Sequence, residues 1–302
     1  MVGLTVSTVC LVLAGCTSGQ AVAKLPDTRQ TTTTTTVPPT TTTTTEQPGW
    51  TPVSTIGGAI VVDSQSVSEP TGHVVTIFRF RAGRTHFALH VGSSDPPRGN
   101  ATVTPDDGPS IGPDEAPALL AAFNGGFEST AGAGGFELNG QVLVPLQSGY
   151  ASLVIDANGS TRVGVWGRDL PTPGEQVAGV RQNLTPLVAA GQPAGNVGDI
   201  TAWGATLGGS AVVARSSVAE DGSGDLLYAA SMNALPVDLA DALISAGAVT
   251  GMELDINPEW VQLASSVTPG GALAPGIPGQ RRPGDQYQVG WSRDFVTVVT
   301  AP

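Results

Sequence analysis

The stretch that decides the fold is Leu119-Leu120-Ala121-Ala122-Phe123-Asn124-Gly125-Gly126-Phe127-Glu128, an apolar run that stops at a polar residue and two glycines. Such a run predicts a buried strand, and the glycines predict a turn whose backbone is open to a ligand. Asn124 can both donate and accept hydrogen bonds, which suits sugar hydroxyls. Candidate substrate-binding residues are therefore Asn124, Gly125, Gly126 and Glu128. The alternative is an ordinary strand-ending turn, in which Asn and Gly tolerate a positive φ.

Further short runs of the same kind surround this stretch. Strands are predicted over residues 74–80, 85–91, 151–155, 211–214, 226–230 and 295–299, with turns at 156–159 and 221–224. One helix is predicted over residues 236–246, with proline in its first turn and Gly247 after its end. No second linker interrupts residues 50–302. The prediction is an α+β fold, a mixed, β-rich single domain with few helices.

A second informative stretch is residues 251–260. It begins with a strand, predicted over 251–256, that follows this helix and carries two acidic residues. Strand alternation places Glu253 and Asp255 on one face, where neighbouring carboxylates shift each other's pKa. This pattern favours acid–base chemistry, and the alternative is an acidic strand end that is solvated or paired with arginine. Glu259 and Trp260 follow directly, and an aromatic ring beside carboxylates is typical of carbohydrate clefts, although tryptophan is also common in cores.

A lone arginine follows the apolar run 211–214. The guanidinium of Arg215 could receive a phosphate or a carboxylate through two hydrogen bonds. A structural ion pair with Asp255 or Asp199 is the alternative.

The composition excludes several chemistries. Thirteen basic residues against 25 acidic ones argue against nucleic acid or an anionic membrane surface as a partner. The lone lysine, Lys24, and the two cysteines, Cys10 and Cys16, precede residue 50, so the domain offers no Schiff-base lysine and no thiol. His86 and His90 share one strand face and favour structural histidines over a metal pair. No cofactor is expected, and no spacing requires a metal.

The amino terminus predicts export and lipid anchoring. Small residues before Cys16, at the end of a short apolar stretch, form a lipobox, so residues 1–15 are expected to be a signal peptide and Cys16 the lipidated residue. Threonine and proline dominate residues 16–49, which predicts a disordered stalk. The expected location is the extracytoplasmic face of the cell membrane. The high content of alanine, glycine and valine, with arginine preferred over lysine, is typical of a GC-rich genome such as that of an actinobacterium.

Three segments in this order resemble the phosphodiester glycosidase family, to which the lysosomal uncovering enzyme is related. They are the Asn124-Gly125-Gly126-Phe127 stretch, Arg215-Ser216-Ser217 with its hairpin, and the helix followed by Leu254-Asp255. The resemblance covers roughly residues 70–300. It implies hydrolysis of a sugar-1-phosphodiester in a surface glycan or polymer, with Asp255 as base or nucleophile. The resemblance also implies that Glu253 is a supporting carboxylate that tunes Asp255, that Arg215 binds the phosphate, and that Asn124 binds a sugar hydroxyl.

Two positions depart from the family pattern. Glu128 replaces a phenylalanine, and Ile256-Asn257-Pro258-Glu259 stands where the family has Gly-Gly-Gly-Ser. Glycines there would bring backbone amides to a phosphate, and Pro258 removes one such donor. A second function therefore stays open, a non-catalytic glycan-binding lipoprotein on the same fold.

Overall fold

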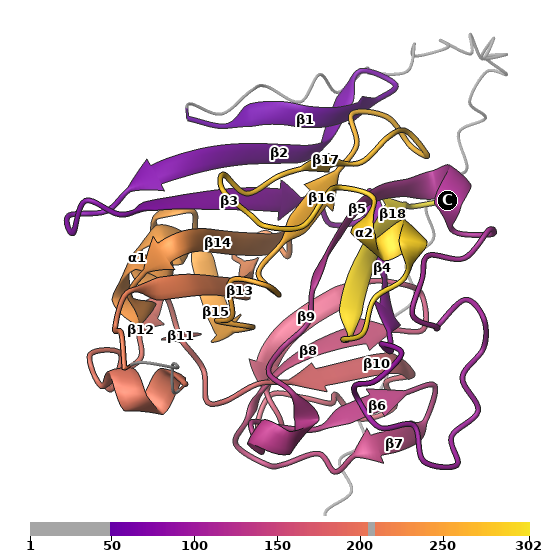
Figure 1. The fold of residues 1–302 in the computed structure, drawn as a ribbon, viewed down its shortest axis with the longest axis horizontal. Helices are drawn as coiled ribbons and strands as arrows, with labels where there is room; N and C mark the ends of the chain where they lie inside the picture. Colours follow the sequence, from indigo (N-terminus) through magenta and orange to yellow (C-terminus); the bar gives the residue numbers. More distant parts are fainter. Residues whose placement is uncertain (1–48, 205–208) are drawn as a thin grey trace, which may run out of the picture. The chain divides into compact units, whose positions relative to one another are not determined.

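The computed structural model describes residues 49–204 and 209–302 (Figure 1). The predicted signal peptide, Cys16 and nearly all of the predicted stalk lie outside these described residues. Within the described ranges, eighteen strands form three sheets, and every pairing between these strands is antiparallel. The predicted fold class, a β-rich single α+β domain with few helices, is confirmed.

The largest sheet has eight strands. Their order across the sheet is β1 (Thr51–Ile56), β2 (Ala59–Ser68), β3 (Val74–Phe80), β14 (Leu226–Ala234), β13 (Val213–Asp221), β15 (Ala248–Glu253), β11 (Val188–Ala189) and β12 (Gln192–Pro193). One sheet of five contains β17 (Ala274–Pro275), β16 (Leu263–Ser265), β5 (Leu119–Asn124), β18 (Phe295–Thr300) and β4 (Thr85–His90). The other contains β7 (Gln141–Val144), β6 (Phe136–Leu138), β10 (Val177–Gln182), β8 (Ala151–Asp156) and β9 (Thr161–Val165).

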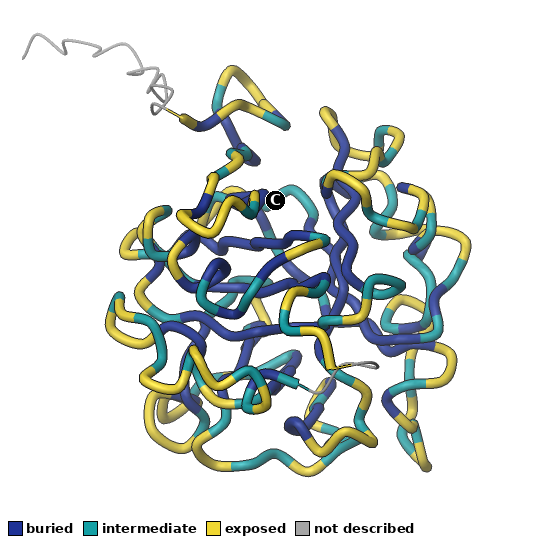
Figure 2. The backbone as a smooth tube through the Cα atoms, turned by 60° about the vertical axis from the view of Figure 1, so that its left-hand side comes forward, coloured by how far each residue is buried: buried dark blue, intermediate teal, exposed yellow. Residues whose placement is uncertain are grey.

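The three sheets share one apolar core, which appears as the buried interior of Figure 2. Phe78 and Tyr228 reach it from the eight-stranded sheet, Phe123 from β5, and Leu153 from β8. The tilted Phe123 and Tyr228 rings lie 5.0 Å apart between their centroids. Because β5 is buried along its whole length, it lies where the sheets meet, and its last residue, Asn124, is held in the interior.

The opposite face of the large sheet is covered by helix α1 (Pro236–Ser245). Strand alternation sends Ile77 and Leu227 to this face, where they cluster with Leu239 and Leu243 of the helix. The Asp238 carboxylate accepts a hydrogen bond from the Leu235 backbone N–H at 2.7 Å and so caps the first turn. The predicted helix is thus confirmed to within one residue. A short second helix, α2 (Gln286–Val289), precedes β18.

Three predicted strands differ from the structure by more than one residue. The strand predicted over 226–230 continues to Ala234. The strand predicted to end at residue 214 begins at Val213 and continues to Asp221, because the buried Arg215 has a carboxylate partner and does not interrupt it. The strand predicted over 251–256 is Ala248–Glu253, so Asp255 lies beyond its end. Both predicted turns, at 156–159 and 221–224, do join consecutive strands.

Three short 3-10 helices complete the described chain, at Ala116–Ala118 (η1), Ser129–Ala131 (η2) and Ile200–Trp203 (η3). None of the helices in the described part of the chain has the length and apolar character needed to cross a membrane.

Candidate active site

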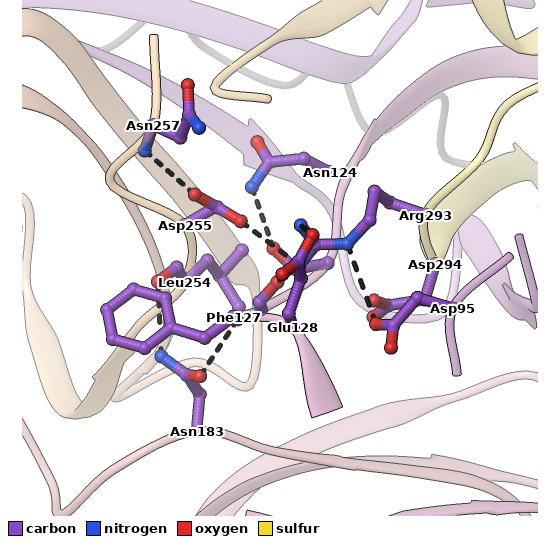
Figure 3. Close-up of polar contacts among 12 residues, drawn as sticks. Asp95, Asn124, Phe127, Glu128, Asn183, Leu254, Asp255, Asn257, Arg293 and Asp294 are labelled. Atoms are coloured by element: carbon purple, nitrogen blue, oxygen red, sulfur yellow. Dashed lines mark hydrogen bonds and ion pairs between the residues drawn. The ribbon is translucent and has the colours of Figure 1, made fainter. Parts of the chain in front are cut away.

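A pocket of about 490 Å³ opens where η3, the turn after β5, the segment after β15 and the residues before β18 come together. Its charged lining residues are Glu128, Asp255 and Arg293, and Phe127 and Trp260 add aromatic surface. The pocket wall therefore carries two carboxylates and one guanidinium, which Figure 3 shows grouped together. A site of this kind is suited to a polar ligand with an aromatic contact surface.

Asp255 is the buried carboxylate of this pocket, and only 4 % of the residue is exposed. Its Oδ1 accepts a hydrogen bond from the Asn257 backbone N–H at 2.8 Å, and its Oδ2 lies 3.4 Å from Nη2 of Arg293. Burial raises the pKa of Asp255 to about 6, although the Arg293 charge opposes this shift. The group can therefore exchange a proton near neutral pH, as a general base requires.

Arg293 is the cation of the pocket, and it belongs to none of the motifs that the sequence singled out. Its Nη1 lies 3.2 Å from Glu128 Oε1, its Nε 3.5 Å from Asp95 Oδ2, and its Nη2 donates to the Gly126 carbonyl at 3.0 Å. Together with Asp255, three carboxylates surround one guanidinium (Figure 3). This arrangement fixes the side chain while leaving it on the pocket wall.

A neighbouring buried ion pair supports the same wall. Arg181 donates from Nε to Asp294 Oδ2 at 2.7 Å and from Nη2 to the Phe127 carbonyl. Asn183 accepts from the Phe127 backbone N–H at 3.0 Å. The sequence does contain a signal for Arg293 and Asp294, since this charged pair stands directly before an apolar strand. Charges at the start of a buried strand need partners.

Asn124 ends β5 as predicted, but its amide hydrogen bonds all go to the protein. Nδ2 donates to the Gly125 carbonyl at 2.8 Å and to Ser216 Oγ at 2.9 Å, while Oδ1 accepts from the Tyr228 hydroxyl at 2.8 Å and the Gln262 backbone N–H at 3.2 Å. The residue is 2 % exposed and does not line the pocket. Its geometry is that of a support behind the site.

Ser216 connects this support to Asp255. Its hydroxyl donates to the Asp255 carbonyl at 3.0 Å, and its backbone N–H donates to the same oxygen. Asn124 and Asp255, from distant parts of the chain, are thus joined through a single serine.

Gly125 and Gly126 lie against protein side chains. A Cβ at Gly125 would overlap the Asp294 carboxylate, and one at Gly126 would lie 2.9 Å from Asn183 Oδ1 and 3.0 Å from the Arg181 guanidinium. Neither glycine has a positive φ. The absence of a side chain is therefore required by close packing of charged and amide groups and not by the turn conformation.

Arg215 and Glu253 form a buried pair behind the pocket. Nη1 of Arg215 lies 2.6 Å from Glu253 Oε1, and the guanidinium also donates to the carbonyls of Trp203 and Ala234 at 3.0 and 3.2 Å. Burial raises the pKa of Glu253 despite the arginine, and the Asp255 charge raises it further. Its Oε2 has no hydrogen-bond partner among the described residues. Neither side chain lines the pocket, and Arg215 pairs with neither Asp255 nor Asp199.

The remaining predicted residues lie at the pocket rim or outside it. Glu128 lines the pocket with a 56 % exposed side chain. Trp260 also lines it, with the Arg293 guanidinium 5.3 Å from its ring centroid. Glu259 faces away, where it pairs with Arg281 at 2.6 Å and does not contribute to the pocket.

No group of three or more histidine, cysteine, aspartate or glutamate residues with a metal-binding arrangement occurs in residues 49–204 and 209–302. His90 is buried, stacked on Phe295 with 4.4 Å between ring centroids, and its Nε2 lies 3.1 Å from Thr297 Oγ1. It thus forms part of the packing between β4 and β18.

Comparison with protein families and with curated proteins finds no match to this chain. Among solved structures, it is similar to the zebrafish N-acetylglucosamine-1-phosphodiester alpha-N-acetylglucosaminidase catalytic domain, auto-inhibited by its pro-peptide. The two chains are 14 % identical, with a TM-score of 0.49 over 83 % of this chain and 87 % of the zebrafish chain.

Two bacterial structures are also similar. A hypothetical protein from Synechocystis is 14 % identical, with a TM-score of 0.43 over 83 % of this chain and 64 % of the other. A protein from Burkholderia pseudomallei described as exported is 12 % identical, with a TM-score of 0.32 over 77 % of this chain and 75 % of the other.

Proposed function

We propose that this chain is a cell-envelope hydrolase that removes a sugar from a sugar-1-phosphodiester in a surface glycan or polymer. The observation that carries the proposal is the pairing of Asp255 with Arg293 on the pocket wall at 3.4 Å. A carboxyl with a pKa of about 6 and a buried guanidinium are the two groups that such a reaction needs side by side.

In this reaction the bond between the anomeric carbon and the phosphate oxygen breaks. Asp255 in its ionised form takes a proton from water as the water oxygen bonds to the anomeric carbon, and the bonding electron pair leaves with the phosphate. The products are a free sugar and a phosphomonoester. Because a phosphate is a good leaving group, strong protonation by a general acid is unnecessary, and Arg293 stabilises the charge that develops on it.

The roles of the predicted residues follow from their positions. We assign the phosphate contact to Arg293, which lines the pocket, in place of Arg215, which is buried behind it. Arg215, paired with Glu253, donates to the Trp203 carbonyl and so holds η3 in place. Asn124 donates to the Ser216 hydroxyl, which in turn donates to the Asp255 carbonyl. The pocket-lining candidates that remain for sugar contact are Glu128 and Trp260.

The envelope location is part of the proposal and is supported by the sequence alone. The lipobox at Cys16 and the threonine-rich residues after it would tether the domain to the membrane through lipid, with the domain outside the cytoplasm.

A glycan-binding protein without turnover is the second candidate. Trp260 favours it, because an aromatic ring on a polar pocket wall can stack on a sugar whether or not a reaction follows. Binding and turnover must therefore be measured separately.

The test uses a sugar-1-phosphodiester with a fluorogenic aglycone, together with an added phosphatase that frees the fluorophore only from the phosphomonoester product. It compares the wild type with Asp255→Asn and Asp285→Asn. Asp285 is exposed and does not line the pocket, so it is the matched control. Removing the base should lower kcat about 10²- to 10⁴-fold, with sugar phosphate binding retained. The wild-type rate should rise with pH through about pH 6, where Asp255 ionises.

Undiminished turnover in Asp255→Asn would overturn the catalytic assignment. Binding by the wild type without any turnover would favour the glycan-binding candidate.

A further inference from the structure

The pocket contains more negative than positive charge, which is unusual for a site that receives a phosphate. Its lining has the carboxylates of Glu128 and Asp255 but a single guanidinium, that of Arg293. Asp95, with a 13 % exposed side chain, adds a third carboxylate 3.5 Å from the same guanidinium. An incoming anion therefore meets an arginine that already has counter-ions.

The three carboxylates differ in how firmly they are held. The Asp255 side chain is 6 % exposed and is fixed by the Asn257 backbone N–H. Asp95 accepts hydrogen bonds from the backbone N–H and the hydroxyl of Ser129. Glu128 is 56 % exposed, and its 3.2 Å contact with Arg293 is the one side-chain interaction that the structure gives it. Moving Glu128 into solvent therefore costs the least.

The hydrogen-bond donors of Arg293 also differ in whether their partners are buried or exposed. Nη2 is directed at the Gly126 carbonyl and Asp255, which are both buried, whereas Nη1 is directed at Glu128 on the solvent side. The N–H groups of Nη1 are thus the ones that a ligand from the pocket can reach. Because Asp95 holds the backbone of Ser129, rotation of the Glu128 side chain alone would uncover them.

We propose that Glu128 is a competing counter-ion, which an anionic group of the substrate must displace from Arg293, and that it thereby sets the affinity of the pocket for anions. The proposal rests on the proposed function, in which Arg293 receives the phosphate. It predicts that neutral sugars leave the Glu128–Arg293 pair intact and that phosphorylated ligands open it. Glu128 would then act as a specificity residue.

The experiment measures the affinity of the protein for inorganic phosphate by isothermal titration calorimetry at low ionic strength and pH 7.5. It compares the wild type with Glu128→Gln and with Glu259→Gln. Glu259 is the matched control, because it is a partly exposed glutamate that pairs with arginine and lies outside the pocket. Glu128→Gln should bind phosphate about fivefold more tightly, which is the upper range for a partly exposed ion pair, and Glu259→Gln should match the wild type.

Arg293→Gln should lose phosphate binding, and its thermal unfolding shows whether it still folds. The Glu128→Gln comparison is independent of that variant. Phosphate binding in Glu128→Gln that equals or is weaker than that of the wild type overturns the proposal. An equal gain in affinity in Glu259→Gln does the same. So does the absence of phosphate binding by both the wild type and Glu128→Gln at about 10 mM phosphate, the concentration range expected for a weak anion contact.

The two proposals fail separately. A gain in phosphate affinity without any turnover of the fluorogenic phosphodiester would reject the hydrolase and keep the role of Glu128. Turnover that depends on Asp255, without a gain in phosphate affinity in Glu128→Gln, would keep the hydrolase and reject the role of Glu128.

Discussion

Arg215 Nη1 lies 2.6 Å from Glu253 Oε1, and neither side chain has any exposed surface. The pair lies between β13 and β15, where Ser217 is the register partner of Glu253. A charge buried in this way is stable only while its partner remains, because removal of one member leaves the other without solvent or counter-ion.

Replacement of Arg215 by methionine should therefore destabilise the fold by about 3–5 kcal/mol at pH 8. The loss should be larger at pH 9.5, because the pKa of Glu253, about 8 beside Arg215, rises further without the arginine, so that only the folded variant still holds the proton at that pH. In the double variant Arg215→Met/Glu253→Gln, part of the stability should return at pH 8. Denaturant unfolding at both pH values measures these differences, and an unchanged midpoint in the single variant would contradict them.

The burial of Asp255 predicts a pH-dependent stability. Its folded-state pKa of about 6 is above the ordinary 3.8, so the folded state binds the proton more tightly. The resulting stabilisation is fully present below about pH 4 and is lost as the pH rises through about 6. Relative to Asp255→Asn, the wild type should lose about 2–3 kcal/mol of unfolding free energy between pH 4 and pH 7. A difference between the two proteins that stays constant over this range would show that the carboxyl is not shifted.

The position of Asn124 predicts that its amide nitrogen is indispensable. Asn124→Asp keeps the oxygen that accepts from Tyr228 but removes both donors, to the Gly125 carbonyl and Ser216. We expect a loss of about 2–3 kcal/mol, since two buried acceptors lose their partner. Asn158→Asp, at an exposed turn, is the control and should cost little. Chemical unfolding measures both variants, and equal stabilities would rule out the supporting role.

Gly125 should not tolerate a methyl group. In Gly125→Ala the new Cβ would overlap the Asp294 carboxylate, which must then move away from Arg181. A destabilisation of about 1–3 kcal/mol is expected for overpacking of this kind. Gly198→Ala, where a Cβ meets open space and φ is not positive, is the control and should be near neutral in thermal unfolding. If both alanine variants unfold like the wild type, the close-packing explanation fails.

The lipobox predicts where the protein is found in cells. Cys16→Ser removes the thiol that receives lipid, so the protein should appear in the medium or remain unprocessed. Membrane fractionation with metabolic lipid labelling measures this. Retention of the label and of membrane association in the variant would refute lipidation at Cys16.

Local sequence determined the fold class, the helix and the principal turns. Apolar alternation and turn residues act over a few neighbours, so the helix at Pro236–Ser245 and the end of β5 at Asn124 could be predicted from the residues themselves. Asp255 could be named as a candidate from the sequence, because strand alternation placed its carboxylate beside that of Glu253 and the family resemblance implied a base there, but the strand in fact ends at Glu253.

The partners of the charged residues were decided by the tertiary structure. Arg215 pairs with Glu253 because the antiparallel register of β13 and β15 brings these two side chains together, and register is a property of the whole sheet. Arg293 reaches Asp255 because β18 pairs with β5 and so places Arg293 beside the turn after Asn124. Asp255 is joined to Asn124 there through Ser216. Sequence periodicity specifies which face of a strand a side chain takes, but packing of distant strands specifies the charge that it meets there.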